Sequence, residues 1–284
     1  SRMAKLSAAG LSLALFLAAC GSDSEGAKDD TSTPTAAGGE ETTTTAASTA
    51  VAPEDNGGRT DGDGTLQLGA VLPQSGNLAQ LGPPMIEGAQ MAARDINEAG
   101  GVNGEQLTMV VKDDGGAGDD DLASTSVDEL INNEKVDAIV GAAASGTTKT
   151  ILDRVVSAGT APCSPSNTGS DLTQADDKGL YFRTPPPDNL QAQALAKVIS
   201  DDGKANVAII AQNTDYGTGF VRYLDPALTD AGAKVVANVT YDEKGTGIDA
   251  EVEKVVSAEP DAVALIGYPE DGGKVIAEMI KQGA

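Results

Sequence analysis

The chain has 284 residues, 40% of them hydrophobic and 22% charged, so it is long enough to bury the core of one or two folded lobes. Its formal net charge of -24 would repel nucleic-acid phosphates and anionic lipid headgroups, which argues against nucleic-acid binding. Histidine is absent, which disfavours a histidine-based hydrolase or metal centre. Aromatic residues make up only 3%, which disfavours a cage for a bulky aromatic ligand.

The first twenty residues have the layout of a secretory signal. Two basic residues, Arg2 and Lys5, precede an apolar run at 11–19 that ends at Cys20. This run is shorter than the roughly 20 apolar residues that a membrane-spanning helix needs. Residues 17–21, Leu-Ala-Ala-Cys-Gly, resemble the bacterial lipobox, which implies that residues 1–20 are a lipoprotein signal peptide with lipid attached at Cys20. The alternative is an unmodified cysteine after an ordinary cleavage site.

Residues 21–64 cannot contribute to a core. Thr, Ser, Ala, Gly, Asp and Glu dominate this segment, and Val51 is its only large apolar residue. Because burial could not offset the entropy of ordering such a sequence, we expect a disordered acidic tether between the membrane and a folded domain.

After Thr65 the pattern changes to short apolar runs separated by longer amphipathic stretches. Continuous Val, Ile, Leu and Ala are typical of parallel strands covered on both faces, and we expect strands at 66–72, 106–112, 138–143, 206–211, 234–239 and 262–266. Apolar residues at helical spacing predict helices around 86–96, 151–156, 190–199, 252–256 and 275–280. This alternation predicts a doubly wound α/β fold.

Prolines interrupt residues 161–187, so we expect no regular element there. This stretch is the natural crossing between two ligand-binding lobes, and we expect the first lobe at 65–187 and the second at 188–284. A second lobe with three strands would be small, so we expect it to be incomplete and the fold to continue beyond Ala284.

The loop at 141–148 is the first candidate for chemistry, because ligands of doubly wound folds bind at the carboxyl ends of strands. Its sequence, Gly-Ala-Ala-Ala-Ser-Gly-Thr-Thr, nearly matches a phosphate loop, but Thr147 stands where lysine is required, which disfavours nucleotide binding. Backbone N–H groups and hydroxyls at a helix start suit one carboxylate instead. The alternative is that Ser145 only caps the helix.

Other polar residues give no catalytic pattern. Asp113 and Asp114 end the second expected strand, and we interpret them as turn and helix-capping residues rather than a metal site or an acid–base pair. Cys163 is interpreted as a small buried residue, with a disulfide to a residue beyond the chain as the alternative. Nucleophile-elbow and dinucleotide motifs are missing from the sequence, so we expect no enzymatic activity, no cofactor and no metal.

Three groups of motifs point to a known family. The first group is Leu-Pro-Gln-Ser-Gly at 72–76, Gln80, Gly82 and Asp-Ile-Asn-Glu-Ala-Gly-Gly-Val-Asn-Gly at 95–104. The second is residues 140–148, Ser-Pro-Ser-Asn-Thr at 164–168 and Leu-Thr at 172–173. The third is Asp-Tyr-Gly-Thr-Gly at 215–219 and Gly-Tyr at 267–268. From about Leu66 to Ala284 the chain resembles the type I periplasmic binding proteins, in particular the leucine/isoleucine/valine-binding receptors of ABC importers. The resemblance implies two lobes, each a doubly wound parallel sheet flanked by helices.

The resemblance also implies an amino-acid site in the cleft between the lobes. Carried over position by position, Ser145, Ser166 and Thr168 of the first lobe are expected to hold the ligand's carboxylate and ammonium. From the second lobe, Tyr216 is expected to close over the ligand and Tyr268 to lie near it.

Two departures from the family pattern leave the ligand open. Branched-chain receptors have an aromatic residue after the position of Gln80, whereas Leu81 stands here and would change the floor of the side-chain pocket. The acidic residue that meets the ligand's ammonium in the family would fall after Ala284. An amide, urea or short-peptide ligand is therefore an alternative to a branched-chain amino acid.

The resemblance further implies two partners and a location. The protein is expected to deliver its ligand to ABC permease subunits, and to be held on the extracytoplasmic face of the cell membrane by the lipid on Cys20. A ligand-sensing lipoprotein with the same fold is the alternative.

Overall fold

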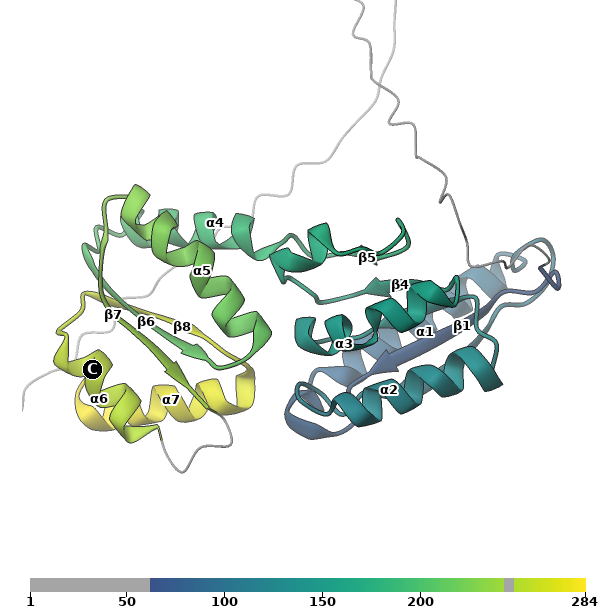
Figure 1. Ribbon diagram of the computed structural model, residues 1–284, viewed down its shortest axis with the longest axis horizontal. Coiled ribbons are helices and arrows are strands. Elements are labelled where there is room, and N and C mark those ends of the chain that lie inside the picture. The colour runs from purple at the N-terminus through teal and green to yellow at the C-terminus, as the bar shows by residue number, and fades with distance from the viewer. Residues whose placement is uncertain (1–61, 243–247) are drawn as a thin grey trace, which may run out of the picture. The chain divides into compact units, whose positions relative to one another are not determined.

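The computed structural model describes residues 62–242 and 248–284 (Figure 1). The expected signal segment with Cys20 and nearly all of the expected tether at 21–64 lie outside the described residues. In the described part, every helix is too short or too polar to cross a bilayer.

The first lobe is built on a five-stranded parallel sheet in the order β2-β1-β3-β4-β5. Its strands are β1 (Gln67–Leu72), β2 (Thr108–Asp113), β3 (Ala138–Gly141), β4 (Ala161–Ser164) and β5 (Phe182–Arg183). The segments between them form η1 (Gly76–Leu78), α1 (Gly82–Glu98), α2 (Asp120–Asp128), η2 (Glu129–Asn133), α3 (Ser145–Ser157) and η3 (Ser170–Gln174).

Both faces of this sheet are covered. Val71 of β1 packs with residues of α2 and α3 in one cluster, whereas its neighbours Ala70 and Leu72 pack with Met85 and Ile86 of α1 on the other face. Because successive strand residues point to opposite faces, a strand buried on both sides reads as a continuous apolar run.

The second lobe has a three-stranded parallel sheet in the order β7-β6-β8. Its elements are α4 (Asp188–Asp201), β6 (Asn206–Gln212), α5 (Asp215–Asp230), β7 (Lys234–Tyr241), α6 (Asp249–Ser257), β8 (Ala262–Ile266) and α7 (Pro269–Gln282). Helices α4 and α5 pack on one face of this sheet, and α6 and α7 pack on the other (Figure 1). Parallel sheets flanked by helices confirm the predicted α/β fold class.

The six expected strands are present as β1, β2, β3, β6, β7 and β8, with small shifts at their ends. The expectation of no regular element at 161–187 is wrong, because β4, η3 and β5 lie there. Pro162 is tolerated within β4 because β5 pairs only with Cys163 and Ser164, so at Pro162 the strand has β3 as its one neighbour. Cys163 has a free thiol and is half-buried rather than buried.

The last strand of the first sheet ends at Arg183 and α4 begins at Asp188, with Pro187 as its N-cap. The division of the chain at residue 187 stays a prediction, as does the assignment of 1–20 and 21–64.

Gly141 ends β3 two residues before the expected end of that strand. Its φ is 129°, and a Cβ at this position would lie 2.0 Å from the carbonyl oxygen of Val71 in β1. Only glycine fits this backbone conformation at such a close approach, and the chain leaves the sheet here and enters the loop that precedes α3.

Candidate functional site

A pocket of about 220 Å³ lies where the carboxyl ends of the strands in both sheets meet. The first lobe contributes the turn around η1, the start of α1 and the loops after β3 and β4, and the second lobe contributes the starts of α5 and α7. All six expected ligand-binding residues line it, namely Leu81, Ser145, Ser166, Thr168, Tyr216 and Tyr268, together with Leu78, Met85, Ala143, Ala144, Gly267 and Pro269. The structure therefore brings the six residues together, and ligand binding by them stays a prediction.

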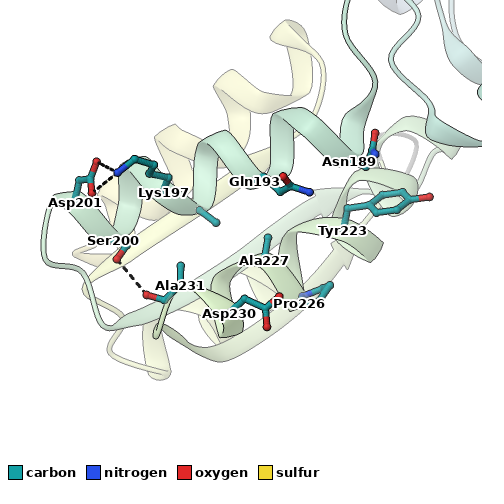
Figure 2. Close-up of a pocket in the computed structure, with 11 residues that line it drawn as sticks. Asn189, Gln193, Lys197, Ser200, Asp201, Tyr223, Pro226, Ala227, Asp230 and Ala231 are labelled. Carbon is teal, nitrogen blue, oxygen red and sulfur yellow. Dashed lines mark hydrogen bonds and ion pairs between the residues drawn. The ribbon is translucent and has the colours of Figure 1, made fainter.

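A larger hollow of about 540 Å³ lies between α4 and α5 of the second lobe (Figure 2). Two of the polar pairs in its lining are local, since Lys197 forms an ion pair with Asp201 at 2.8 Å and Ser200 donates to the carbonyl of Ala231 at 3.1 Å. These groups do not converge on a common point as the polar groups of a ligand site do. Size alone therefore does not identify the functional site, and the smaller pocket is the better candidate.

Ser145 is the first residue of α3, and the N-cap position belongs to Ala144, whose side chain makes no capping bond. The Ser145 hydroxyl oxygen instead accepts a hydrogen bond from the backbone N–H of Gly169 at 3.1 Å. The interpretation of Ser145 as only a helix cap is therefore wrong. Its hydroxyl proton is available to a ligand carboxylate, and the N-terminus of α3 adds a favourable dipole.

The loop after β4 is fastened to the loop after β3 by buried hydrogen bonds. The Ser166 hydroxyl donates to the carbonyl of Ala143 at 2.8 Å. The amide of Asn167, which is fully buried, donates to the same carbonyl at 2.8 Å and accepts from the hydroxyls of Thr148 at 2.6 Å and Tyr181 at 2.9 Å. Asn167 thus fixes Ser166 and Thr168 on either side of it. No role was expected for Asn167, although its place between two expected ligand contacts was a signal in the sequence.

Asp113 holds the turn that leads to the apolar part of the pocket. Its carboxylate accepts hydrogen bonds from the backbone N–H of Gln74 at 2.7 Å, from the hydroxyl of Ser75 at 2.6 Å and from the N–H of Gly115 at 2.9 Å. Partial burial raises the pKa of Asp113, but these hydrogen bonds together outweigh it and leave the pKa below its ordinary value. The turn at 73–77 is thereby fixed, and Leu78 and Leu81 follow it.

Asp114 is fully buried and holds the second loop. It accepts from the N–H of Gly116 at 2.8 Å and from the N–H of Ala143 at 3.3 Å, and burial raises its pKa to about 6. The interpretation of Asp113 and Asp114 as turn residues is confirmed. Their role as helix caps is wrong, because Asp119 caps α2 by accepting from Leu122. Across the described ranges, His, Cys, Asp and Glu side chains form no cluster of three or more that could hold a metal ion.

The wall from the second lobe is aromatic. The rings of Tyr216 and Tyr268 are stacked with centroids 5.6 Å apart, and Phe220 meets Tyr216 edge-on at 6.1 Å. Thr214 caps α5 by accepting from the N–H of Gly217 at 3.1 Å, which places Tyr216 on the first turn of that helix. Burial, aided by the charge of Asp188, raises the pKa of Tyr216, so its phenol keeps its proton as a donor.

Charged side chains join the two lobes near this pocket. Lys149 of α3 forms ion pairs with Asp171 of η3 at 3.0 Å and with Asp215 of α5 at 3.3 Å, and Arg222 of α5 lies 3.5 Å from Asp171. These pairs escape sequence reasoning because their members are distant in the chain and have no characteristic spacing.

Comparisons with known proteins agree with this architecture. A family model described as "Periplasmic binding protein" matches residues 65–284. The leucine-, isoleucine-, valine-, threonine-, and alanine-binding protein of Pseudomonas aeruginosa is 30% identical over 220 residues, covering 77% of this chain and 58% of its own length. The chemotactic signal transduction system substrate-binding protein BasB of Halobacterium salinarum is 29% identical, covering 76% of this chain and 53% of its own length.

A solved structure shows the same fold. The branched-chain amino acid transporter substrate-binding protein LivJ from Streptococcus pneumoniae, in complex with isoleucine, superposes with a TM-score of 0.70 at 28% identity. The match covers 77% of this chain and 62% of the other. The chain thus spans less than two thirds of the length of each of these proteins.

Proposed function

Because the chain belongs to the periplasmic binding protein family, whose model matches residues 65–284, we propose that it is the extracytoplasmic receptor of an ABC importer. It binds a branched-chain amino acid in the cleft between a first lobe at 65–187 and a second lobe at 188–284, and delivers it to a permease. It catalyses no reaction. The relatives named above are binding proteins, which supports a binding role.

The observation that carries this proposal is the convergence of the six expected residues on one pocket. Ser145, Ser166 and Thr168 lie on its first-lobe wall, and Tyr216 and Tyr268 lie on its second-lobe wall. Neutral hydroxyls and a helix N-terminus hold a carboxylate without arginine when water is excluded, because hydrogen bonds to a charged group are strong in a dry site.

The apolar end of the pocket suits an aliphatic side chain. Leu78, Leu81 and Met85 line it from one short stretch of the first lobe, and Pro269 lines it from the second lobe. A branched-chain amino acid brings an apolar side chain of matching character, and its burial favours binding by about 0.8 kcal/mol for each CH₂ group removed from water. Leu81, which stands where the family has an aromatic residue, leaves this end aliphatic.

Binding and closure are one equilibrium in this proposal. A ligand that touches both walls favours the closed arrangement of the lobes, since its contacts with Tyr216 and Tyr268 exist only when the walls meet. The permease then recognises the closed form.

The experiment that tests the proposal is thermal unfolding of the purified protein without residues 1–64, in the presence of individual amino acids, small amides and urea. A ligand at 100 times its dissociation constant stabilises the native state by about 2.7 kcal/mol, which raises the midpoint measurably. We expect leucine, isoleucine or valine to do so. A shift with only an amide or urea would refute the amino-acid assignment, and no shift with any compound would refute the receptor.

The membrane anchor is a separate proposal that rests on the lipobox-like residues at 17–21. Lipid on Cys20 holds the receptor on the extracytoplasmic face of the cell membrane. Replacing Cys20 with alanine should release the protein from washed membranes into the soluble fraction, and mass spectrometry should lose the acyl chains. Membrane retention of the Cys20→Ala protein would contradict lipid anchoring.

A second candidate function is ligand sensing, and one comparison favours it, since a relative at 29% identity is named as part of a chemotactic signal transduction system. Deleting the gene separates the two candidates. Loss of radiolabelled leucine uptake supports import, whereas unchanged uptake with loss of a response to leucine supports sensing.

A further inference from the structure

A buried hydrogen bond lies at the carboxyl end of the second sheet, outside the pocket. Tyr241 is the last residue of β7, and its hydroxyl donates to the carboxylate of Asp271 on the first turn of α7. Both side chains are buried, and the second carboxyl oxygen of Asp271 has no hydrogen-bond partner in the described part of the chain. Buried polar groups are costly to leave unpaired, so this bond ties the end of β7 to the start of α7.

Gly267, which follows β8, lies directly against this hydrogen bond. A Cβ on Gly267 would lie 2.2 Å from the hydroxyl oxygen of Tyr241 and 3.5 Å from a carboxylate oxygen of Asp271. The hydroxyl therefore occupies the volume that a larger residue at position 267 would need. Gly267 also lines the pocket, so the hydrogen bond supports the second-lobe wall from behind.

Tyr268 stands between the two points that this bond touches. It is the N-cap of α7, and its side chain makes no capping hydrogen bond. Its ring instead stacks on Tyr216 with centroids 5.6 Å apart. Its carbonyl accepts from the N–H of Gly272 at 2.8 Å, which makes its backbone part of the first turn of α7. A contact that fixes Gly267 before it and Asp271 after it therefore fixes the direction of the Tyr268 ring.

We propose that Tyr241 and Asp271 are positioning residues for ligand binding, and that their hydrogen bond holds Tyr268 against Tyr216 before a ligand arrives. The second-lobe wall is then preformed, so less conformational entropy is lost when it closes over the ligand. Neither Tyr241 nor Asp271 lines the pocket, and both act through Tyr268. This inference rests on the proposed binding function, because it explains part of the affinity of the same pocket.

The position of Tyr241 itself does not depend on its hydroxyl. Its carbonyl accepts from the N–H of Asn213 at 2.8 Å, and its ring packs in the same core cluster as Val252 and Val275. Tyr241→Phe therefore keeps the ring in place and removes only the connection to Asp271.

The first test is calorimetric titration with leucine. Tyr241→Phe should weaken leucine binding about threefold to tenfold, because the ring of Tyr268 is no longer held. In Tyr268→Ala, adding Tyr241→Phe should change the affinity by less than about twofold, since the residue through which it acts is gone. The control is Ser200→Ala, which removes a hydroxyl that donates to the carbonyl of Ala231 at 3.1 Å in the same lobe, and it should leave leucine affinity unchanged.

The second test needs no ligand. The chain has no tryptophan, so its near-ultraviolet circular dichroism reports mainly the packing of its five tyrosines. The difference between the spectra of the wild-type protein and Tyr268→Leu gives the contribution of Tyr268. The same difference measured in the Tyr241→Phe protein should be smaller, because the ring is then less fixed.

The third test concerns the close approach to Gly267. Gly267→Ala should lower the midpoint of urea unfolding, because its Cβ meets the Tyr241 hydroxyl. With Tyr241→Phe in the same chain, the nearest remaining contact of the Cβ is the ring carbon that carried the hydroxyl, at 3.4 Å. The double variant should therefore lose less stability than the sum of the two single losses. Additive losses would show that the hydroxyl does not lie against Gly267.

The outcomes distinguish this inference from the function on which it rests. If the wild-type protein binds leucine, and Tyr241→Phe weakens binding equally with and without Tyr268→Ala, the positioning role is refuted and the receptor function stands. A loss of the same size in Ser200→Ala would refute it as well. If the wild-type protein does not bind leucine, the role in leucine binding fails with the proposed function. Equal dichroism differences would then also refute the support of Tyr268, whereas a smaller difference in Tyr241→Phe would uphold it.

Discussion

The two walls of the pocket are constructed in different ways. On the first-lobe side, the side chains of Asp113, Asp114 and Asn167 hold the loops by hydrogen bonds, and those of Asp114 and Asn167 are buried. On the second-lobe side, Tyr216 and Tyr268 stack on each other at the starts of two helices. One wall is a fixed set of polar groups, and the other is a pair of large rings.

The difference indicates a division of labour. A wall whose loops are already hydrogen-bonded loses little entropy when it receives the charged groups of a ligand, so it is suited to be the first point of contact. Stacked rings supply large contact area with few bonds to break, which suits a surface that closes over the ligand. We therefore expect damage to either wall to weaken ligand binding, and loss of the ion pairs of Lys149 near the pocket to weaken it least.

The largest expected effect is a loss of stability caused by a substitution at Gly141, where the chain leaves β3 and enters the loop of the first wall. Gly141→Ala places a Cβ about 2.0 Å from the Val71 carbonyl at a φ of 129°, and should destabilise the protein by roughly 3 kcal/mol or more in urea unfolding. The control is Gly88→Ala in α1, where nothing lies within 4 Å of the added Cβ and the helix should gain up to about 1 kcal/mol. Equal stability of the two variants would show that the turn is not constrained as described.

The second effect concerns Asp114 and pH. Its folded-state pKa of about 6 lies above the value of 3.8 for a free carboxyl group, so the folded state binds this proton more tightly than the unfolded state. Ionising Asp114 therefore lowers the stability of the folded protein. This loss is absent below about pH 4 and complete above about pH 6, where it reaches up to about 3 kcal/mol.

This contribution of Asp114 is measured by comparing the free energy of unfolding of the wild-type protein and of Asp114→Asn at several pH values. Between pH 4 and pH 7 the wild-type protein should lose stability relative to the variant. Parallel pH curves for the two proteins would show that Asp114 titrates as an ordinary carboxyl group.

The third effect tests the hydrogen bonds that hold the loops of the first wall, independently of the stacked tyrosine rings of the second wall. Asn167→Ala leaves the hydroxyls of Thr148 and Tyr181 and the carbonyl of Ala143 without the partner described above, and should cost about 2 kcal/mol of stability. Ligand affinity should fall with it, because Ser166 and Thr168 flank this residue. A variant with lower stability and unchanged affinity, measured by calorimetry, would show that the loop does not position the ligand.

The smallest effect is expected from the ion pairs that Lys149 makes near the pocket. Lys149→Met removes an ion pair with Asp215 between the lobes and one with Asp171 within the first lobe, and because both are partly exposed it should weaken ligand binding by less than about 1 kcal/mol. The difference from the wild-type protein should vanish at roughly 0.5 M salt. Lys197→Met, which breaks an ion pair within α4, is the control and should leave affinity unchanged. A loss that persists at high salt would indicate a packing role for Lys149.

Sequence reasoning located the strands well because each is an apolar run covered on both faces. It missed α5, whose Gly217, Gly219 and Pro226 weaken helical propensity, although Phe220, Leu224 and Leu228 at helical spacing pack on the sheet. It also missed β4, because Pro162 argues against a strand unless the pairing at that position is known. Tertiary packing decides both cases.

Five of the six pocket residues were predictable because the family motifs carry them, and Leu81 was predictable from its position between Gln80 and Gly82. The side chains that hold the loops behind the pocket were not predictable. Asn167 acts through buried hydrogen bonds to groups distant in the chain, which a sequence does not display. Asp113 and Asp114 were read as turn residues, yet the loop that each holds comes from a different part of the chain.

The most direct test of the central claim, that both walls close on one amino acid, is calorimetric titration of leucine into the wild-type protein, Thr168→Ala and Tyr216→Ala. Thr168→Ala removes a hydroxyl from one wall, and Tyr216→Ala removes a stacked ring with its hydroxyl from the other. Each should weaken binding by about 1 to 3 kcal/mol. Unchanged affinity in both variants would contradict the assignment of this pocket as the ligand site.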